Sequence, residues 1–246
     1  MKMPTIEGVI RRRILLNYRV DAAVVQGLLP EPFRPQLVGG FAIAGICLIR
    51  LEQVRPSGWL RWIGVSSENS AHRFAVEWEG VDGEQQDGVY IPRRDSGSWF
   101  NSLAGGRLFP GVHKSSRFDV EDRAGDIHLK VHCQEVAGTL VEIRASETQS
   151  FPEGSVFGSA DEASRFFEKG CLGYSPSQDD CTLDGLLLEV KKWQVAPLQI
   201  DRAISAYFDD HLVFPEGSIE LDHALLMRDI PHSWHAQPRI ELGEAQ

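Results

Sequence analysis

One lysine stands apart in a chain that has few lysines beside its arginines. Lys114 follows the turn-like sequence Gly111-Val112-His113, between an expected helix end and an expected strand. A lysine amine forms a Schiff base with a carbonyl carbon when it is neutral, and burial or a nearby cation lowers its pKa from about 10.4. Arg107 and Arg117 are such cations in sequence. Lys114 is therefore a candidate nucleophile, and a solvated surface lysine is the alternative interpretation.

The histidines and cysteines do not predict a metal site. His128 and His132 are four residues apart in an expected strand, so they share a face but are about 13 Å apart, too far for one ion. His232 and His235 form a possible loop pair, for which polar residues at a sheet rim are the alternative. The four cysteines lack C-x-x-C spacing, and no P-loop, G-x-G-x-x-G, H-E-x-x-H or G-x-S-x-G motif is present. We expect neither a metal nor a cofactor.

The candidate residues would be positioned mainly by β-strands. Alternating and continuous apolar runs between turn residues are typical of strands, whereas helical periodicity is rare in this chain. A chain with many strands and few helices favours a curved or closed antiparallel sheet within an α+β, β-rich fold. The predicted strands are Val9–Tyr18, Phe41–Val54, His72–Glu79, Gly88–Arg94, Ser116–Glu121, Ile127–Glu135, Leu140–Glu147, Leu186–Val195 and Ile219–Arg228.

Four short helices are predicted between the strands. The clearest is Ser159–Lys169, in which Ser159 is the N-cap, Glu162 completes a capping box and Gly170 ends the helix. Asp21 caps a helix over 22–29 that stops before a proline. The remaining two helices are Ser98–Ala104 and Asp201–Asp209.

Composition limits the class of protein. The chain has 246 residues, a net charge of −10 and no internal repeat, so we expect one acidic domain over 1–246 that does not bind nucleic acid. No apolar run reaches the length of about 18 residues that a membrane helix requires. The first residues lack the apolar region of a signal peptide, so we expect a cytoplasmic protein. Whether it forms a homo-oligomer is left open.

Two segments resemble the acetoacetate decarboxylases. The sequence from Gly106 to Lys114 is similar to their G-R-E-x-x-G-x-P-K-K region, although Leu108, His113 and Ser115 replace the glutamate, the proline and the second lysine. Upstream, Y-R-V-D at 18–21 and L-L-P-E-P-F at 28–33 resemble the family's Y-R-T-D and V-P-E-P-L opening.

The whole chain more closely resembles the DUF2071 (YqjF-like) group of the same superfamily. This resemblance extends nearly end to end and depends on the order of short motifs. The motifs are Asn17-Tyr18, Val54-Arg55-Pro56, Gly88-Val89-Tyr90-Ile91, Ala224-Leu225-Leu226-Met227-Arg228 and Pro231-His232-Ser233-Trp234.

The resemblance implies a fold and a set of site residues. The fold is a strongly curved antiparallel sheet that closes into a cone or barrel around a ligand cavity, with helices outside. Lys114 matches the Schiff-base lysine, Arg11 matches a pocket arginine, and the pocket glutamate falls at Asn69 with Glu68 beside it. We expect Lys114, Arg11 and Glu68 to be catalytic. The residues expected to contact substrate are Asn69, Arg73, His113 and Tyr90.

Two functions follow from these expectations. In the first, a small keto acid or related carbonyl metabolite enters the cavity, Arg11 holds its carboxylate, and Lys114 forms an imine that serves as an electron sink for decarboxylation, aldol chemistry or dehydration. In the second, the same scaffold binds a small molecule without catalysis. The residues alone do not choose between an enzyme and a binding protein.

Overall fold

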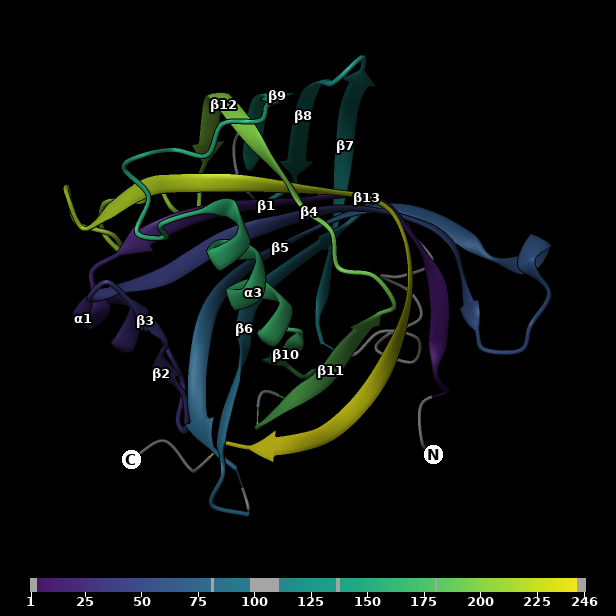
Figure 1. Ribbon diagram of the computed structural model, residues 1–246. Helices are drawn as coiled ribbons and strands as arrows, with labels where there is room; N and C mark the ends of the chain where they lie inside the picture. The colour runs from purple at the N-terminus through teal and green to yellow at the C-terminus, as the bar shows by residue number, and fades with distance from the viewer. Residues whose placement is uncertain (1–3, 81, 98–110, 136–137, 180, 243–246) are drawn as a thin grey trace.

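The protein, seen in a computed structural model, is described over residues 4–80, 82–97, 111–135, 138–179 and 181–242. Thirteen strands of these residues form one continuous hydrogen-bonded sheet (Figure 1). The strands are β1 (Ile6–Val20), β2 (Arg34–Pro35), β3 (Leu37–Val38), β4 (Phe41–Pro56), β5 (Val65–Glu79), β6 (Gln85–Ser96), β7 (His113–Arg123), β8 (Asp126–Cys133), β9 (Val141–Glu147), β10 (Leu172–Pro176), β11 (Thr182–Val190), β12 (Ala196–Ser205) and β13 (Ile219–Glu241).

The sheet curves until its strands pair in a ring, which confirms the predicted fold class. Strands β13, β1, β4, β5, β6, β10 and β11 pair in that order, and β11 pairs again with β13. We call this set the cavity ring. A second path leads from β6 through β7, β8, β9 and β12 back to β13. Most pairs are antiparallel, but β6 pairs in parallel with both β7 and β10.

Two of the β-bulges on the strands that the two paths share change the direction of side chains near the cavity. The pairing of β1 with β4 shifts between Ile10 and Arg12, so Arg11 is an extra residue on β1. The pairing of β1 with β13 shifts between Asn17 and Tyr18, so Asp222 is an extra residue on β13. A bulge bends its strand and re-aims the side chains beside it.

The two described α-helices pack against different hydrophobic clusters of the sheet. Helix α3 (Ala160–Lys169) begins as predicted, with the Ser159 hydroxyl accepting a hydrogen bond from the Glu162 amide at 3.2 Å. The Glu162 carboxylate accepts from the Gly158 amide at 2.8 Å, one residue before the position that a capping box uses. Helix α3 lies against the sheet (Figure 1), and its Ala163 and Phe167 side chains belong to a hydrophobic cluster with sheet residues.

The other described helices are shorter or differ from the prediction. Helix α1 (Ala22–Gln26) is capped by Asp21 as predicted but ends earlier, at Gly27. A single 3₁₀ turn, η1 (Arg61–Ile63), lies at the tip of the long β4–β5 hairpin (Figure 1). The predicted helix over 98–104 lies outside the described residues. None of the described helices is long and apolar enough to cross a membrane.

The predicted helix over 201–209 is wrong, because most of this segment belongs to β12. Residues from Leu198 to Ser205 pair with β9, and only the residues after Ser205 form a turn. Helix propensity is a weak preference, and the hydrogen bonds and packing that β9 offers exceed it.

Candidate functional site

A cavity of about 120 Å³ lies inside the cavity ring. Each strand of the ring contributes at least one residue to the cavity wall; examples are Arg13 on β1 and Trp234 on β13. A dry cavity of about 150 Å³ holds benzene, so this one has room for a ligand of about six heavy atoms. Much of the wall is apolar, and its apolar side chains include Ile49, Leu51, Val89, Ile91, Leu186 and Leu188.

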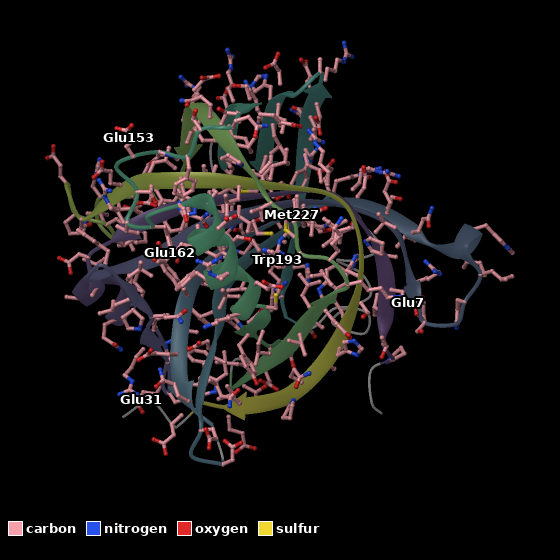
Figure 2. All side chains as sticks on the ribbon, in the orientation of Figure 1. Glu7, Glu31, Glu153, Glu162, Trp193 and Met227 are labelled. Carbon is pink, nitrogen blue, oxygen red and sulfur yellow. The ribbon has the colours of Figure 1, made fainter. Side chains whose placement is uncertain are left out.

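Three arginines, Arg13, Arg73 and Arg94, line this apolar cavity. The Arg13 Nε is 3.3 Å from the Sγ of Cys47, and its guanidinium lies over the Trp193 ring at 5.5 Å from the centroid. Figure 2 labels Trp193 beside Met227, whose sulfur is 3.9 Å from Arg13 Nη1. Soft and aromatic groups therefore surround a guanidinium that would otherwise be hydrated.

Arg73 is the most buried of the three, with 5% of its surface exposed. Its Nη2 donates to the Oδ1 of Asn17 at 2.6 Å, and its guanidinium stacks 4.8 Å from the Phe167 ring centroid. Its Nε has no hydrogen-bond partner among the described residues. Burial lowers the pKa of Arg73 to about 10, so it stays charged at neutral pH.

Arg94 completes the set from β6. Its Nε donates to the Ser175 hydroxyl at 2.7 Å, and burial lowers the pKa of Arg94 to about 10. Across the part of the chain that the structure describes, no carboxylate is ion-paired with Arg13, Arg73 or Arg94. The one acidic side chain at the wall, Asp95, is bound by Arg93 at 2.9 Å. Among the described residues, the three cavity arginines therefore carry positive charge without a carboxylate in ion-pair contact.

Three of the residues predicted to contact substrate lie at this cavity: Asn69, Arg73 and His113. Asn69 is held by two serines, donating to Ser67 Oγ at 2.8 Å and accepting from Ser96 Oγ at 2.8 Å. Asn69, and not its neighbour Glu68, faces the cavity. That these three residues bind a ligand stays a prediction.

The structure contradicts the predicted position of Arg11. Its side chain is 51% exposed on the outside, where it pairs with Glu52 at 2.9 Å and with Asp229. Regular alternation would place Arg11 and Arg13 on one face. The bulge at Arg11 breaks the alternation, so Arg13 alone points into the cavity.

Lys114 is also not among the residues that line the cavity. Its side chain is 39% exposed, and its Nζ lies 2.6 Å from the Oε2 of Glu135. Neighbouring residues of a strand point to opposite faces. Since His113 takes the inward position on β7, Lys114 points away from the cavity wall. The predicted meeting of Lys114 and Arg11 in one pocket is wrong.

Glu68 and Tyr90 lie on the face opposite to their cavity-lining neighbours. Glu68 is bound to Arg12 at 2.7 Å and lines a separate polar groove, and burial raises its pKa although Arg12 opposes the shift. Tyr90 packs in the main hydrophobic core, 5.9 Å from the Phe33 ring. The neighbours of Tyr90 on β6, Val89 and Ile91, take the inward positions.

The prediction missed the two other cavity arginines, Arg13 and Arg94. Each belongs to a run of adjacent arginines, 11–13 and 93–94, of which one member faces inward. The run itself was a usable signal. Which arginine of a run faces the cavity depends on the strand register, and the sequence does not reveal that register. No group of three or more His, Cys, Asp or Glu among the described residues is placed to hold a metal ion.

Comparison with known proteins agrees with this geometry. The DUF2071 family, described as "Uncharacterized conserved protein", matches residues 9–224. The chain belongs to the DUF2071 family. No curated protein sequence matches this DUF2071 chain significantly.

Solved structures share the fold of this DUF2071 protein at low sequence identity. Acetoacetate decarboxylase from Legionella pneumophila subsp. pneumophila str. Philadelphia 1 is 12% identical with a TM-score of 0.62, covering 98% of this chain and 88% of its own. An acetoacetate decarboxylase-like enzyme from Sphingomonas wittichii RW1 is 13% identical with a TM-score of 0.61, covering 99% and 95%. The enduracididine biosynthesis enzyme MppR, complexed with pyruvate, is 11% identical with a TM-score of 0.59, covering 99% and 92%.

Proposed function

We propose that this DUF2071 protein binds a small organic acid in the cavity ring. The observation that carries the proposal is the set of three arginines, Arg13, Arg73 and Arg94, that line an apolar cavity and have no ion-paired carboxylate among the described residues. The acid's carboxylate would contact these guanidiniums, and its carbon skeleton would contact the aliphatic wall.

The energetics of buried charge support an anionic ligand. A buried charge is costly unless it is paired, and the cost is several kcal/mol for an ion that lacks a partner. A carboxylate in the cavity would pair with the arginines in a medium where charge-assisted hydrogen bonds are strong. The cavity volume of about 120 Å³ limits the ligand to a small molecule.

A keto acid is the ligand that the structural relatives favour. One of them, MppR, is complexed with pyruvate, and others are acetoacetate decarboxylases or similar to them. We therefore propose a short 2- or 3-keto acid as the ligand class. The described geometry best supports a protein that binds this acid and forms no covalent bond to it through Lys114.

Schiff-base catalysis at Lys114 is the second candidate. In its favour, Lys114 matches the decarboxylase lysine in sequence and follows His113, which lines the cavity. Against it, imine formation requires a neutral amine, whereas the Lys114 amine is salt-bridged to Glu135 at 2.6 Å. A ligand would have to break this ion pair and draw the side chain inward.

Calorimetric titration tests the binding proposal. We expect pyruvate and 2-oxobutyrate to bind and pyruvamide, which lacks the carboxylate, not to bind. Arg73→Met should weaken pyruvate binding by about tenfold to a hundredfold, because charged hydrogen bonds are lost. Arg117→Met is the matched control, since Arg117 is 72% exposed on β7 and outside the cavity. Equal affinity for pyruvate and pyruvamide would refute the proposal.

Borohydride reduction separates the two candidates. Wild-type protein and Lys114→Arg are incubated with pyruvate and borohydride, and the intact mass is measured. A mass increase in wild type that is absent from Lys114→Arg would establish the Schiff base. Pyruvate binding with no trapped adduct in either protein would establish a binding site without imine chemistry at Lys114.

A further inference from the structure

A chain of buried hydrogen bonds leads away from the cavity behind Arg73. Arg73 Nη2 donates to Asn17 Oδ1 at 2.6 Å, and Asn17 Nδ2 lies 3.1 Å from His223 Nε2. His223 Nδ1 lies 2.6 Å from Asp222 Oδ2. Asn17 and His223 are 0% and 2% exposed, so water does not compete for these bonds. Four residues from three strands thus form one continuous network that ends at a cavity arginine.

The bulge at Asp222 makes this network possible. Adjacent residues in a regular strand point to opposite faces and do not bond to each other. Asp222 is the extra residue of β13 opposite β1, and its carboxylate reaches the ring of its own neighbour, His223. The carboxylate is held in turn by Ser155 Oγ at 2.5 Å and by the Val156 amide at 2.9 Å.

The direction of each hydrogen bond follows from its partners. The Asp222 carboxylate only accepts, so His223 Nδ1 donates and His223 Nε2 accepts. Asn17 Nδ2 donates to His223 Nε2, and it also donates to the Leu15 carbonyl oxygen at 3.1 Å. Asn17 must then present its oxygen to Arg73. Two acceptors, His223 and Leu15, fix the orientation of the one amide that holds the guanidinium.

We propose that Asn17, His223 and Asp222 position the Arg73 guanidinium for the ligand carboxylate, and that tight anion binding requires neutral His223. The inference deepens the proposed function and rests on it. The three residues touch Arg73 or each other, not the ligand, so they are positioning residues.

Protonation of His223 would reverse one bond of the network. Its Nε2–H would then face the Asn17 NH₂ group, and two donors would oppose each other. Rotating the Asn17 amide would relieve this conflict but would place its oxygen against the Leu15 carbonyl and its NH₂ against Arg73. Either outcome removes the bond that orients Arg73.

The surroundings of His223 keep it neutral in the free protein. Burial lowers the pKa of His223 below its usual value of 6.5, although Asp222 opposes the shift. The charged groups that face the network are Asp222, Arg73 and Arg19, whose Nη1 is 3.5 Å from Asp222 Oδ1. The rings of Phe151, Phe157 and Phe167 pack around the imidazole.

The test is the pH dependence of pyruvate binding, measured by calorimetry on the full chain. Pyruvate stays ionised across the range, since carboxyl groups of this kind titrate near about pH 3.5. In wild type we expect the affinity for pyruvate to be constant near neutral pH. The affinity should fall as the pH drops below about 6.5, the usual pKa of histidine. Asn17→Ala should weaken binding by about tenfold at neutral pH, because the acceptor is lost.

Two glutamine variants give the readout that a purely structural role would not produce. His223→Gln retains an acceptor for Asn17 but does not titrate, so we expect near wild-type affinity at neutral pH without the fall at acid pH. His72→Gln is the control: His72 is equally buried on β5, beside Arg73, but faces the main core. It should keep both the affinity and the pH dependence of wild type.

The outcomes separate this inference from the proposed function. If wild type binds pyruvate through Arg73 but His223→Gln retains the acid-side fall, the positioning inference is overturned and the proposed function stands. The same holds if Asn17→Ala, folded by circular dichroism, binds as wild type does. If wild type binds no keto acid at any pH, the proposed function fails and the inference fails with it.

Discussion

At the scale of the residue, the bulge in β1 leaves Arg11 exposed and its neighbour Arg12 buried. Arg12 is 4% exposed and contacts Glu68 at 2.7 Å and Asp122 at 3.4 Å. We expect Arg12→Met to lower the free energy of unfolding by about 3 kcal/mol, because the largely buried Glu68 carboxylate loses its 2.7 Å partner. Asp122 keeps its ion pair with Arg228 at 2.8 Å. Urea denaturation measures the change.

Arg11→Met is the matched control for this prediction. Arg11 is half exposed and its partners are solvated, so its replacement should leave the urea midpoint close to that of wild type. Equal destabilisation by the two substitutions would contradict the assignment of Arg12 as the buried member of the arginine run.

His72 should make the fold sensitive to acid. It is 0% exposed, and burial lowers the pKa of His72 to about 3 from the usual 6.5. Below pH 6.5, therefore, His72 binds a proton in the unfolded chain but stays neutral in the folded chain until the pH approaches about 3. Stability contributed by neutral His72 is complete above 6.5 and is lost at up to about 1.4 kcal/mol per pH unit as the pH falls toward about 3.

Urea titrations at several pH values measure this loss. His72→Gln does not titrate and should show a shallower decline in stability between about pH 6 and pH 4. His223 and His232, whose pKa values burial also lowers, account for part of the slope that remains. A decline of unchanged slope in His72→Gln would exclude His72 as a source of the acid sensitivity.

At the scale of the element, the start of helix α3 is determined by a residue next to it, the N-cap Ser159. Ser159→Ala should lower the free energy of unfolding by about 1 kcal/mol, since the Glu162 amide loses its acceptor. Ser159→Gly should cost only a few tenths of a kcal/mol, because glycine is tolerated at this position. Urea denaturation compares the two, and an alanine variant no less stable than the glycine variant would argue against the cap.

The sequence predicted elements better than it predicted register. The apolar run from Phe41 and the cap at Ser159 are local signals, and the strands and helix that they predict are present. The helix predicted over 201–209 is a strand because β9 pairs with it, which is a nonlocal effect. The family resemblance predicted Arg11 inside the cavity, and one extra residue in β1 places it outside. Bulges depend on partner strands, so the inward arginines could not be chosen from the sequence alone.

At the scale of the molecule, the cavity and the hydrophobic core are built from the same strands. Strands β13, β1, β4, β5 and β6 belong to both paths of the sheet. Along these strands, inward residues on one face line the cavity, as Arg73 does, while neighbours such as Phe74 fill the main core. A change of register in any of them would exchange the two environments, so the lining of the cavity depends on the packing of the whole sheet.

The pairing of β13 also has a consequence for the order in which the protein acquires its shape. β1 leaves the ribosome long before its partner β13, which begins at Ile219. Until then one edge of β1 has no permanent partner, and neither path of the sheet closes, because β13 completes both. Pairings between strands so distant in sequence form slowly and leave open edges exposed in the interval. The nascent chain therefore completes this sheet only after β13 has been synthesised, and a ribosome that stalls before Ile219 presents the cell with an open-edged sheet.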